Sequence, residues 1–138
     1  MSLAQRFAQV VGGIYLMVGI LGFTLPLLLF SLPGGVGGPF AGYLVSLFVV
    51  NWHHSLAHLL IGMGGLATYR NSTTASIYTL AVGVTFAMLL IVGITFHLLF
   101  GGLLPLKVWD HAVHPLTALI AFGAYFASRE EPATSSRL

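Results

Sequence analysis

Residues 54–69 read HSLAHLLIGMGGLATY and residues 110–125 read DHAVHPLTALIAFGAY, and the two segments follow one pattern. The two segments align at an offset of 56 residues, the separation between His54 and Asp110. In each, a polar pair four residues apart precedes two small residues and then a tyrosine. The matched pairs are His54 with Asp110, His58 with His114, Gly62 with Ala118, Gly65 with Ala121, and Tyr69 with Tyr125. A repeat of this kind indicates an architecture of two similar units.

The matched positions follow the spacing i, i+4, i+8, i+11 and i+15, which places them along one stripe of a helix. Small residues let membrane helices approach closely, so we expect the stripe to face the interior of a helical bundle. The polar positions of the two stripes should therefore converge near the bundle axis: His54, His58, Asp110 and His114.

The composition predicts a membrane protein. Hydrophobic residues make up 57% of the chain and charged residues only 6%, whereas soluble domains carry about 25% charged residues. Five basic and three acidic side chains cannot cover the surface of a 14.7 kDa globule. The chain has no cysteine, which excludes disulfides, thiolate catalysis and iron–sulfur ligation. No basic cluster is present, so nucleic-acid binding is not expected.

Four segments are apolar and long enough, or nearly so, to cross a bilayer as helices, which takes about 20 residues. We place them at about residues 8–30, 51–69, 74–100 and 110–128. They form a single transmembrane domain within residues 1–138, followed by a short polar cytoplasmic tail at 129–138.

The start of the second helix has two interpretations. The apolar region 42–69 is too long for one untilted span, and a polar run beginning at Asn51 interrupts it. We place the helix start at Asn51, with residues 44–50 along the outer interface. In the alternative, a longer helix puts the histidines in mid-membrane.

The basic residues predict the orientation. Lys107 falls on one side of this arrangement, and four arginines fall on the other: Arg6, Arg70, Arg129 and Arg137. The positive-inside rule then places both termini in the cytoplasm. The first and third helices also share weaker matches, including Tyr15 with Tyr78 and Phe23 with Phe86. We therefore predict an all-α membrane protein of two tandem helical hairpins, in a bacterial inner (cytoplasmic) or other energy-transducing membrane.

These motifs also suggest a family. The arrangement of Asn51 with His54 and His58, then Asp110 with His114, resembles bacterial four-helix membrane proteins known only as a domain of unknown function. The resemblance covers most of the chain, from the first helix to the fourth. It implies the fold and leaves the activity open.

The histidines favour a binding site near the outer face. His54 and His58 are one turn apart and could hold one ion, as paired helix histidines do in zinc proteins. With His114 and Asp110 they would supply three nitrogens and one oxygen, a set suited to zinc, copper or non-haem iron. A tetrapyrrole is the other candidate: haem between His58 and His114, or chlorophyll on one histidine. His97 could join this site from the third helix.

Two other interpretations remain open. In a structural one, Asn51 and Asp110 are helix N-caps, and hydrogen bonds of the histidines only fix the register of the bundle. Proton or ion conduction would need polar groups through the full thickness, but the inner half offers little beyond tyrosines such as Tyr15 and scattered threonines. The sequence has no H-E-x-x-H, G-x-S-x-G or P-loop motif. We therefore expect a small non-catalytic accessory subunit, embedded in the lipid bilayer within a larger membrane complex or a homo-oligomer.

Overall fold

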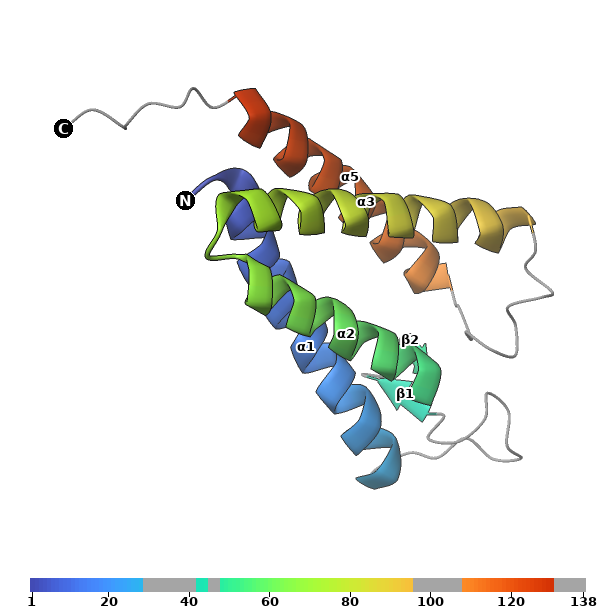
Figure 1. Ribbon diagram of the computed structural model, residues 1–138. Coiled ribbons are helices and arrows are strands. Elements are labelled where there is room, and N and C mark those ends of the chain that lie inside the picture. The colour runs from blue at the N-terminus through green and yellow to red at the C-terminus, as the bar shows by residue number, and fades with distance from the viewer. Residues whose placement is uncertain (29–41, 45–47, 96–107, 131–138) are drawn as a thin grey trace.

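The computed structural model describes residues 1–28, 42–44, 48–95 and 108–130. Within these ranges it contains four helices and one pair of short strands (Figure 1). In chain order the elements are α1 (Leu3–Leu28), β1 (Gly42–Leu44), β2 (Phe48–Val50), α2 (Trp52–Thr68), α3 (Ser72–Thr95) and α5 (Val108–Glu130). The described part of the chain is therefore helical apart from β1 and β2, and it has the predicted number of helices.

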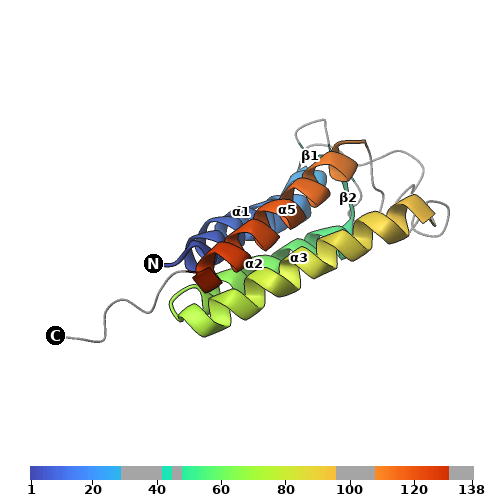
Figure 2. The same cartoon turned by 90° about the horizontal axis from the view of Figure 1, so that it is seen from above.

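The four helices pack as two hairpins, as the repeat predicted. Among the helix pairs, α1 with α2 and α3 with α5 make the most extensive contacts. Figure 2 shows α1 beside α5 in one layer and α2 beside α3 in the other. Over their described residues, α2 and α5 approach each other closely at few points. The N-terminus, the turn between α2 and α3, and the end of α5 lie at the same end of the bundle (Figure 1).

Helix α1 begins at Leu3, five residues earlier than predicted, because a capping box precedes it. The backbone N–H of Gln5 donates to Ser2 Oγ at 3.3 Å, and the backbone N–H of Ser2 donates to Gln5 Oε1 at 2.9 Å. This reciprocal pair satisfies two backbone donors that the first turn leaves unpaired. The Ser-x-x-Gln pattern was present in the sequence, so this start could have been predicted.

Helix α2 begins where Asn51 predicts. Asn51 adopts an extended conformation, and its Oδ1 accepts the backbone N–H of His54 at 3.0 Å. Before it, β1 and β2 pair antiparallel, with Gly42 opposite Val50. A single long helix over residues 42–69 is therefore excluded. The segment is rich in β-branched and aromatic residues, which favour strands.

The other two helix starts differ from the prediction by two residues. Helix α3 begins at Ser72 because Asn71 caps it, accepting backbone N–H groups of Thr73 and Thr74 at 2.9 and 3.1 Å. Helix α5 begins at Val108, so Asp110 lies inside its first turn, and the predicted N-cap role of Asp110 is wrong. An acidic residue in a first turn still suits the positive end of the helix dipole. The predicted end of the third helix, residues 96–100, lies outside the described residues.

The first hairpin is held by glycine. Helices α1 and α2 approach so closely that a Cβ atom added to Gly65 would lie 2.6 Å from the Cα of Gly12. A Cβ atom on Gly19 would lie 2.6 Å from the backbone nitrogen of Leu59. Gly62 faces the backbone of Leu16 in the same way. Backbone-to-backbone contact of this kind is open only to small residues.

The second hairpin packs through side chains. Val82 and Phe86 of α3 meet Ala118 and Ala121 of α5, and Phe7 and Tyr15 of α1 complete this apolar core. Three polar contacts join the start of α1 to α5, to α3 and to the turn between α2 and α3. The backbone N–H of Ala4 donates to Ser128 Oγ at 2.7 Å, the Thr79 hydroxyl donates to the Ala4 carbonyl at 3.3 Å, and Gln5 Nε2 donates to the Arg70 carbonyl at 3.2 Å.

Two of the helices contain stretches long and apolar enough to cross a membrane, at residues 3–24 of α1 and 72–93 of α3. Helix α2 spans 17 residues, and α5 spans 23 residues with Pro115 inside it.

Candidate metal centre

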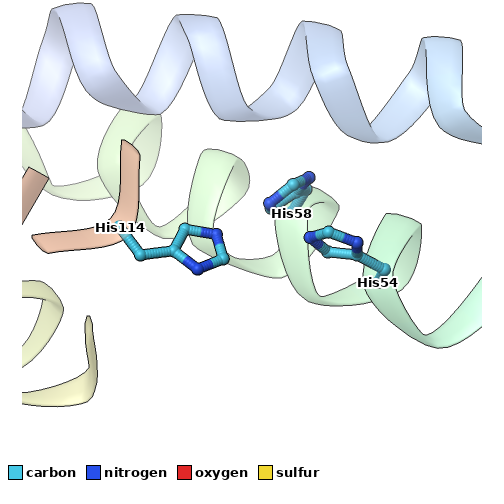
Figure 3. Close-up of side chains that lie close together, drawn as sticks. All are labelled: His54, His58 and His114. Atoms are coloured by element: carbon cyan, nitrogen blue, oxygen red, sulfur yellow. The ribbon is translucent and has the colours of Figure 1, made fainter. Parts of the chain in front are cut away.

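Three buried histidines meet between the two hairpins. Each of His54, His58 and His114 offers a ring nitrogen, and these nitrogens all lie within 4.8 Å of one another. Figure 3 shows His54 and His58 side by side on α2, with His114 reaching toward them from α5. Their exposed fractions are 4%, 8% and 8%. The cluster is therefore shielded from the surroundings of the bundle.

Helix geometry and capping fix the two histidines of α2. His54 and His58 are four residues apart and so lie on the same face, with ring centroids 4.4 Å apart. The backbone N–H of His54 is itself the group that Asn51 caps. Because the cap orders the first turn, it also sets the position of His54. The third histidine, His114, lies in the second turn of α5, and its ring centroid is 6.2 Å from that of His54.

Two aromatic side chains form the walls of the cluster. The ring of Tyr15 meets His58 edge to face at 5.0 Å. Phe86 stacks on His114 at 4.9 Å, with an angle of 24° between the rings. Tyr15 and Phe86 also contact each other at 5.5 Å. All four helices thus contribute to the site, with α1 and α3 supplying the walls.

A hydrogen bond behind the histidine cluster links α1 to α5. The hydroxyls of Tyr15 and Thr117 lie 3.3 Å apart and share a hydrogen bond. The Thr117 hydroxyl also donates to the carbonyl of Val113 at 2.9 Å. The tyrosine ring is therefore held in place against His58 from the opposite hairpin.

His58 has a polar atom that the described residues do not satisfy. Its Nδ1 is buried and has no hydrogen-bond partner among them. Leaving a buried polar group unpaired costs about 1–3 kcal/mol. A metal ion would engage imidazole nitrogens in this cluster, and neutral imidazole is a common metal ligand.

The spacing suits a metal ion after a small adjustment. Metal–nitrogen bonds of about 2.0–2.1 Å place the nitrogens of one centre roughly 3.3–3.6 Å apart. The observed separations of up to 4.8 Å would close by modest rotation of the side chains. In Figure 3 the ring of His114 points toward those of His54 and His58.

The predicted site residues have different outcomes. The structure brings His54, His58 and His114 together. The backbone of Asp110 lies one turn before His114 at the start of α5, but its side chain is outside the described part of the structure. His97 also lies outside the described residues. The assignment of all five as ligands stays a prediction.

The repeated stripe faces inward on both helices, as predicted. On α2, His58, Gly62 and Gly65 are buried, and on α5 their partners are buried as well: His114, Ala118 and Ala121. Both stripes end in a half-buried tyrosine next to an arginine. Arg70 Nε donates to the Tyr69 hydroxyl at 3.1 Å, and Arg129 Nη1 donates to the Tyr125 hydroxyl at 3.4 Å.

Sequence reasoning missed the two aromatic walls. It placed Tyr15 in the inner half of the bundle, whereas its ring contacts His58. It used Phe86 only as a repeat match, whereas Phe86 stacks on His114. Spacing along one helix cannot reveal which side chain of another helix will face it. The only available signal was the shared tyrosine and phenylalanine positions of the first and third helices.

Comparison with protein families identifies a family for this chain. The family model described as "Domain of unknown function (DUF4383)" matches residues 5–127, which include all four helices except the ends of α1 and α5. No curated protein and no solved structure gives a significant match. The matched segment covers most of the chain and includes Asn51 and the three clustered histidines, so this chain belongs to the DUF4383 family, whose function is unknown.

Proposed function

We propose that this chain is an integral membrane protein that binds one transition-metal ion through His54, His58 and His114. The observation that carries the proposal is the convergence of three buried imidazoles from two hairpins. Imidazole nitrogens suit zinc, copper, iron and nickel. The predicted ligand Asp110 is not part of the proposed centre, because its side chain lies outside the described part of the structure.

A four-span arrangement in the membrane is part of the proposal. The 17 residues of α2 reach the lower end of the range for a spanning helix, about 17–25 residues. Both α2 and α5 carry large apolar side chains on their outer faces, which suits contact with lipid. These exposed residues are Leu56, Leu60, Met63 and Leu66 on α2, and Leu116, Leu119, Ile120 and Phe126 on α5.

The proposed orientation puts the histidines near the outer side. Arg6, Arg70 and Arg129 belong to the end of the bundle where the N-terminus and the α2–α3 turn lie. By the positive-inside rule this end is cytoplasmic. His54 lies in the first turn of α2, at the opposite end. We place the protein in a bacterial inner membrane or another energy-transducing membrane, with the metal site in the outer half of the bundle.

The close grouping favours a bare ion over a tetrapyrrole. In a haem with two axial histidines, the macrocycle occupies the plane around the iron. A third imidazole within 4.8 Å of both axial nitrogens would collide with that ring. The ring centroids of His54 and His58, only 4.4 Å apart, leave no room for a flat macrocycle between them. A small ion accepts the same three nitrogens without conflict.

We propose a binding role without catalysis, in an accessory subunit. The full sequence carries none of the common hydrolase or phosphate-binding motifs. The partner, whether a larger membrane complex or a second copy, stays a prediction. The three-histidine site would give such a subunit a metal to hold or to hand over.

Elemental analysis tests the proposal. The protein is purified in mild detergent, dialysed against divalent and monovalent metals in turn, and measured by mass spectrometry for bound metal. We expect close to one ion per chain, lost in His58→Ala and in His114→Ala. His53→Ala is the matched control. His53 is half-buried and does not belong to the three-histidine cluster. Its ring packs against that of Trp52, with the ring centroids 3.6 Å apart.

Circular dichroism of each variant checks that the helices persist. Equal metal in the His58 and His53 variants would overturn the proposal. So would a wild-type protein that binds no metal under any loading condition. In that case the histidines would be structural, and the same variants should weaken assembly with a partner.

A further inference from the structure

We propose that the three-histidine site selects copper in its +1 oxidation state over zinc and other divalent ions. This inference rests on the proposed metal-binding function and names the ion. It follows from the charge of the ligand set, from the walls around it and from the number of ligands. None of these depends on the partner of the protein.

The ligands carry no charge. Imidazole binds metal in its neutral form, and His54, His58 and His114 are the group that converges in the described structure. The chain has no cysteine that could add a thiolate. All four methionines have exposed side chains, so no thioether joins the cluster: Met1, Met17, Met63 and Met88. The net charge of the three-histidine centre therefore equals the charge of the ion.

The surroundings penalise charge. The three histidines are at most 8% exposed, and Tyr15 and Phe86 cover them with aromatic rings. The cost of moving an ion from water to a low-dielectric interior rises with the square of its charge, so a +2 centre costs about four times as much as a +1 centre. A divalent ion would need a hydroxide or a carboxylate to lower its charge. A Cu⁺ ion needs neither.

The number of ligands points the same way. Structural zinc sites are almost always four-coordinate, and catalytic zinc sites keep a water in the fourth position. Cu⁺, in contrast, forms stable complexes with three nitrogen donors. Phe86 stacks on His114, and the Tyr15 ring meets His58 edge to face, so aromatic rings border two of the three ligands. Among divalent ions, nitrogen sites already bind copper most tightly, so copper is favoured in either oxidation state.

An anaerobic competition tests the preference. The wild-type protein in detergent is titrated with Cu⁺ against the Cu⁺ chelator bicinchoninate, and separately with Zn²⁺ against a zinc-binding dye. We expect one Cu⁺ per chain, bound more tightly than Zn²⁺ because the buried centre then carries half the charge. Zinc-loaded protein should release its zinc when one equivalent of Cu⁺ is added.

Electron paramagnetic resonance gives an independent readout. Copper-loaded protein should stay silent after exposure to air, because oxidation would place a second charge in the apolar site. His58→Ala should lose Cu⁺ binding, whereas His53→Ala should keep it. Tighter binding of Zn²⁺, or a full Cu²⁺ signal in air, would overturn the copper assignment and leave the metal-binding function standing. Failure to bind either ion would instead overturn the proposed function.

Discussion

The two hairpins share one sequence pattern and pack in different ways. In the first, α1 and α2 touch through their backbones at glycines such as Gly12 and Gly65. In the second, α3 and α5 are separated by alanine, valine and phenylalanine side chains. The glycine hairpin presents two histidines on one rigid face, and the other presents one histidine backed by Phe86. Both repeats thus carry an inward stripe, and the size of the residues on that stripe sets how close the helices come.

The difference also explains why the site lies between the hairpins. Helices α2 and α5 meet closely at few points over their described residues, so their histidines project into the space between them (Figure 3). Helix α1 contacts both helices of the second hairpin and holds the two units together. A metal ion would add a direct connection between α2 and α5 to these contacts.

The largest effect should come from breaking the glycine hairpin. In Gly62→Ala, the new Cβ atom would collide with the backbone nitrogen and the Cα of Leu16, which cannot move aside as the far end of a flexible side chain could. Overpacking costs about 1–3 kcal/mol, and collision with backbone belongs at the upper end. Unfolding in denaturing detergent, followed by circular dichroism, measures the loss.

Gly13→Ala is the control for that change. A Cβ atom on Gly13 meets nothing within 4 Å, so this substitution should be neutral or stabilising by up to about 1 kcal/mol through helix propensity. Equal stability of the Gly62 and Gly13 variants would show that the close approach of α1 and α2 does not hold the hairpin together.

The next effect concerns the connection between the hairpins. At a metal concentration 100 times the dissociation constant, binding should stabilise the fold by about 2.7 kcal/mol. Because the chain has no cysteine, spin labels can be attached through Leu56→Cys on α2 and Leu116→Cys on α5, both at exposed positions. Metal should narrow the measured distance distribution between the labels.

The same labels in a His114→Ala background give the contrast. This variant keeps both histidines of α2 and removes the one ligand from α5, so metal should no longer change the distance or the stability. If metal changes neither quantity in the parent protein while elemental analysis shows it bound, the ion does not connect the hairpins.

More of the fold than of the site could be predicted from the sequence. The inward stripe followed from period and residue size, so the burial of Gly65 and Ala121 was predictable. The cap at Asn51 was predictable because its side chain acts on a backbone group three residues away. These are local rules, and they apply before the chain folds. The two-residue error at the start of α5 reflects the weakness of boundary signals where Pro105 and Lys107 precede a helix.

Contacts between segments that are distant in the sequence could not be predicted. Tyr15 and His58 are 43 positions apart in the sequence, yet their rings are in contact. This contact depends on how α1 and α2 pack against each other, which no local sequence pattern encodes. The short β1–β2 pair was also missed, because short apolar runs look alike whether helical or extended. Convergence of the three histidines was predictable in kind from the repeat, but their separation of at most 4.8 Å required the structure.

A smaller effect is expected from removing a helix N-cap, and it should differ between Asn51, beside the histidine cluster, and Asn71, at the start of α3. Asn51→Ala removes the hydrogen bond to the His54 backbone N–H and should cost about 1 kcal/mol of stability. Because this bond orders the turn that carries His54, metal affinity should fall as well. Asn71→Ala removes the equivalent cap of α3 and should cost similar stability with no change in metal affinity. Loss of affinity in both variants would mean that general destabilisation, and not the position of His54, controls the site.

The smallest effect on stability should come from substituting Gly83, a glycine of α3 in the second hairpin. A Cβ atom on Gly83 would lie 3.1 and 3.2 Å from atoms of the Phe122 ring and 3.3 Å from the Ala121 Cβ. These neighbours are side chains, so they can shift by a few tenths of an ångström, and Gly83→Ala should change stability by less than about 1 kcal/mol, since the gain in helix propensity offsets the contact. Gly123→Ala, where nothing lies within 4 Å, sets the baseline for propensity alone. A loss at Gly83 as large as that at Gly62, measured by the same unfolding assay, would mean that both hairpins are packed to backbone contact and that the contrast between them is false.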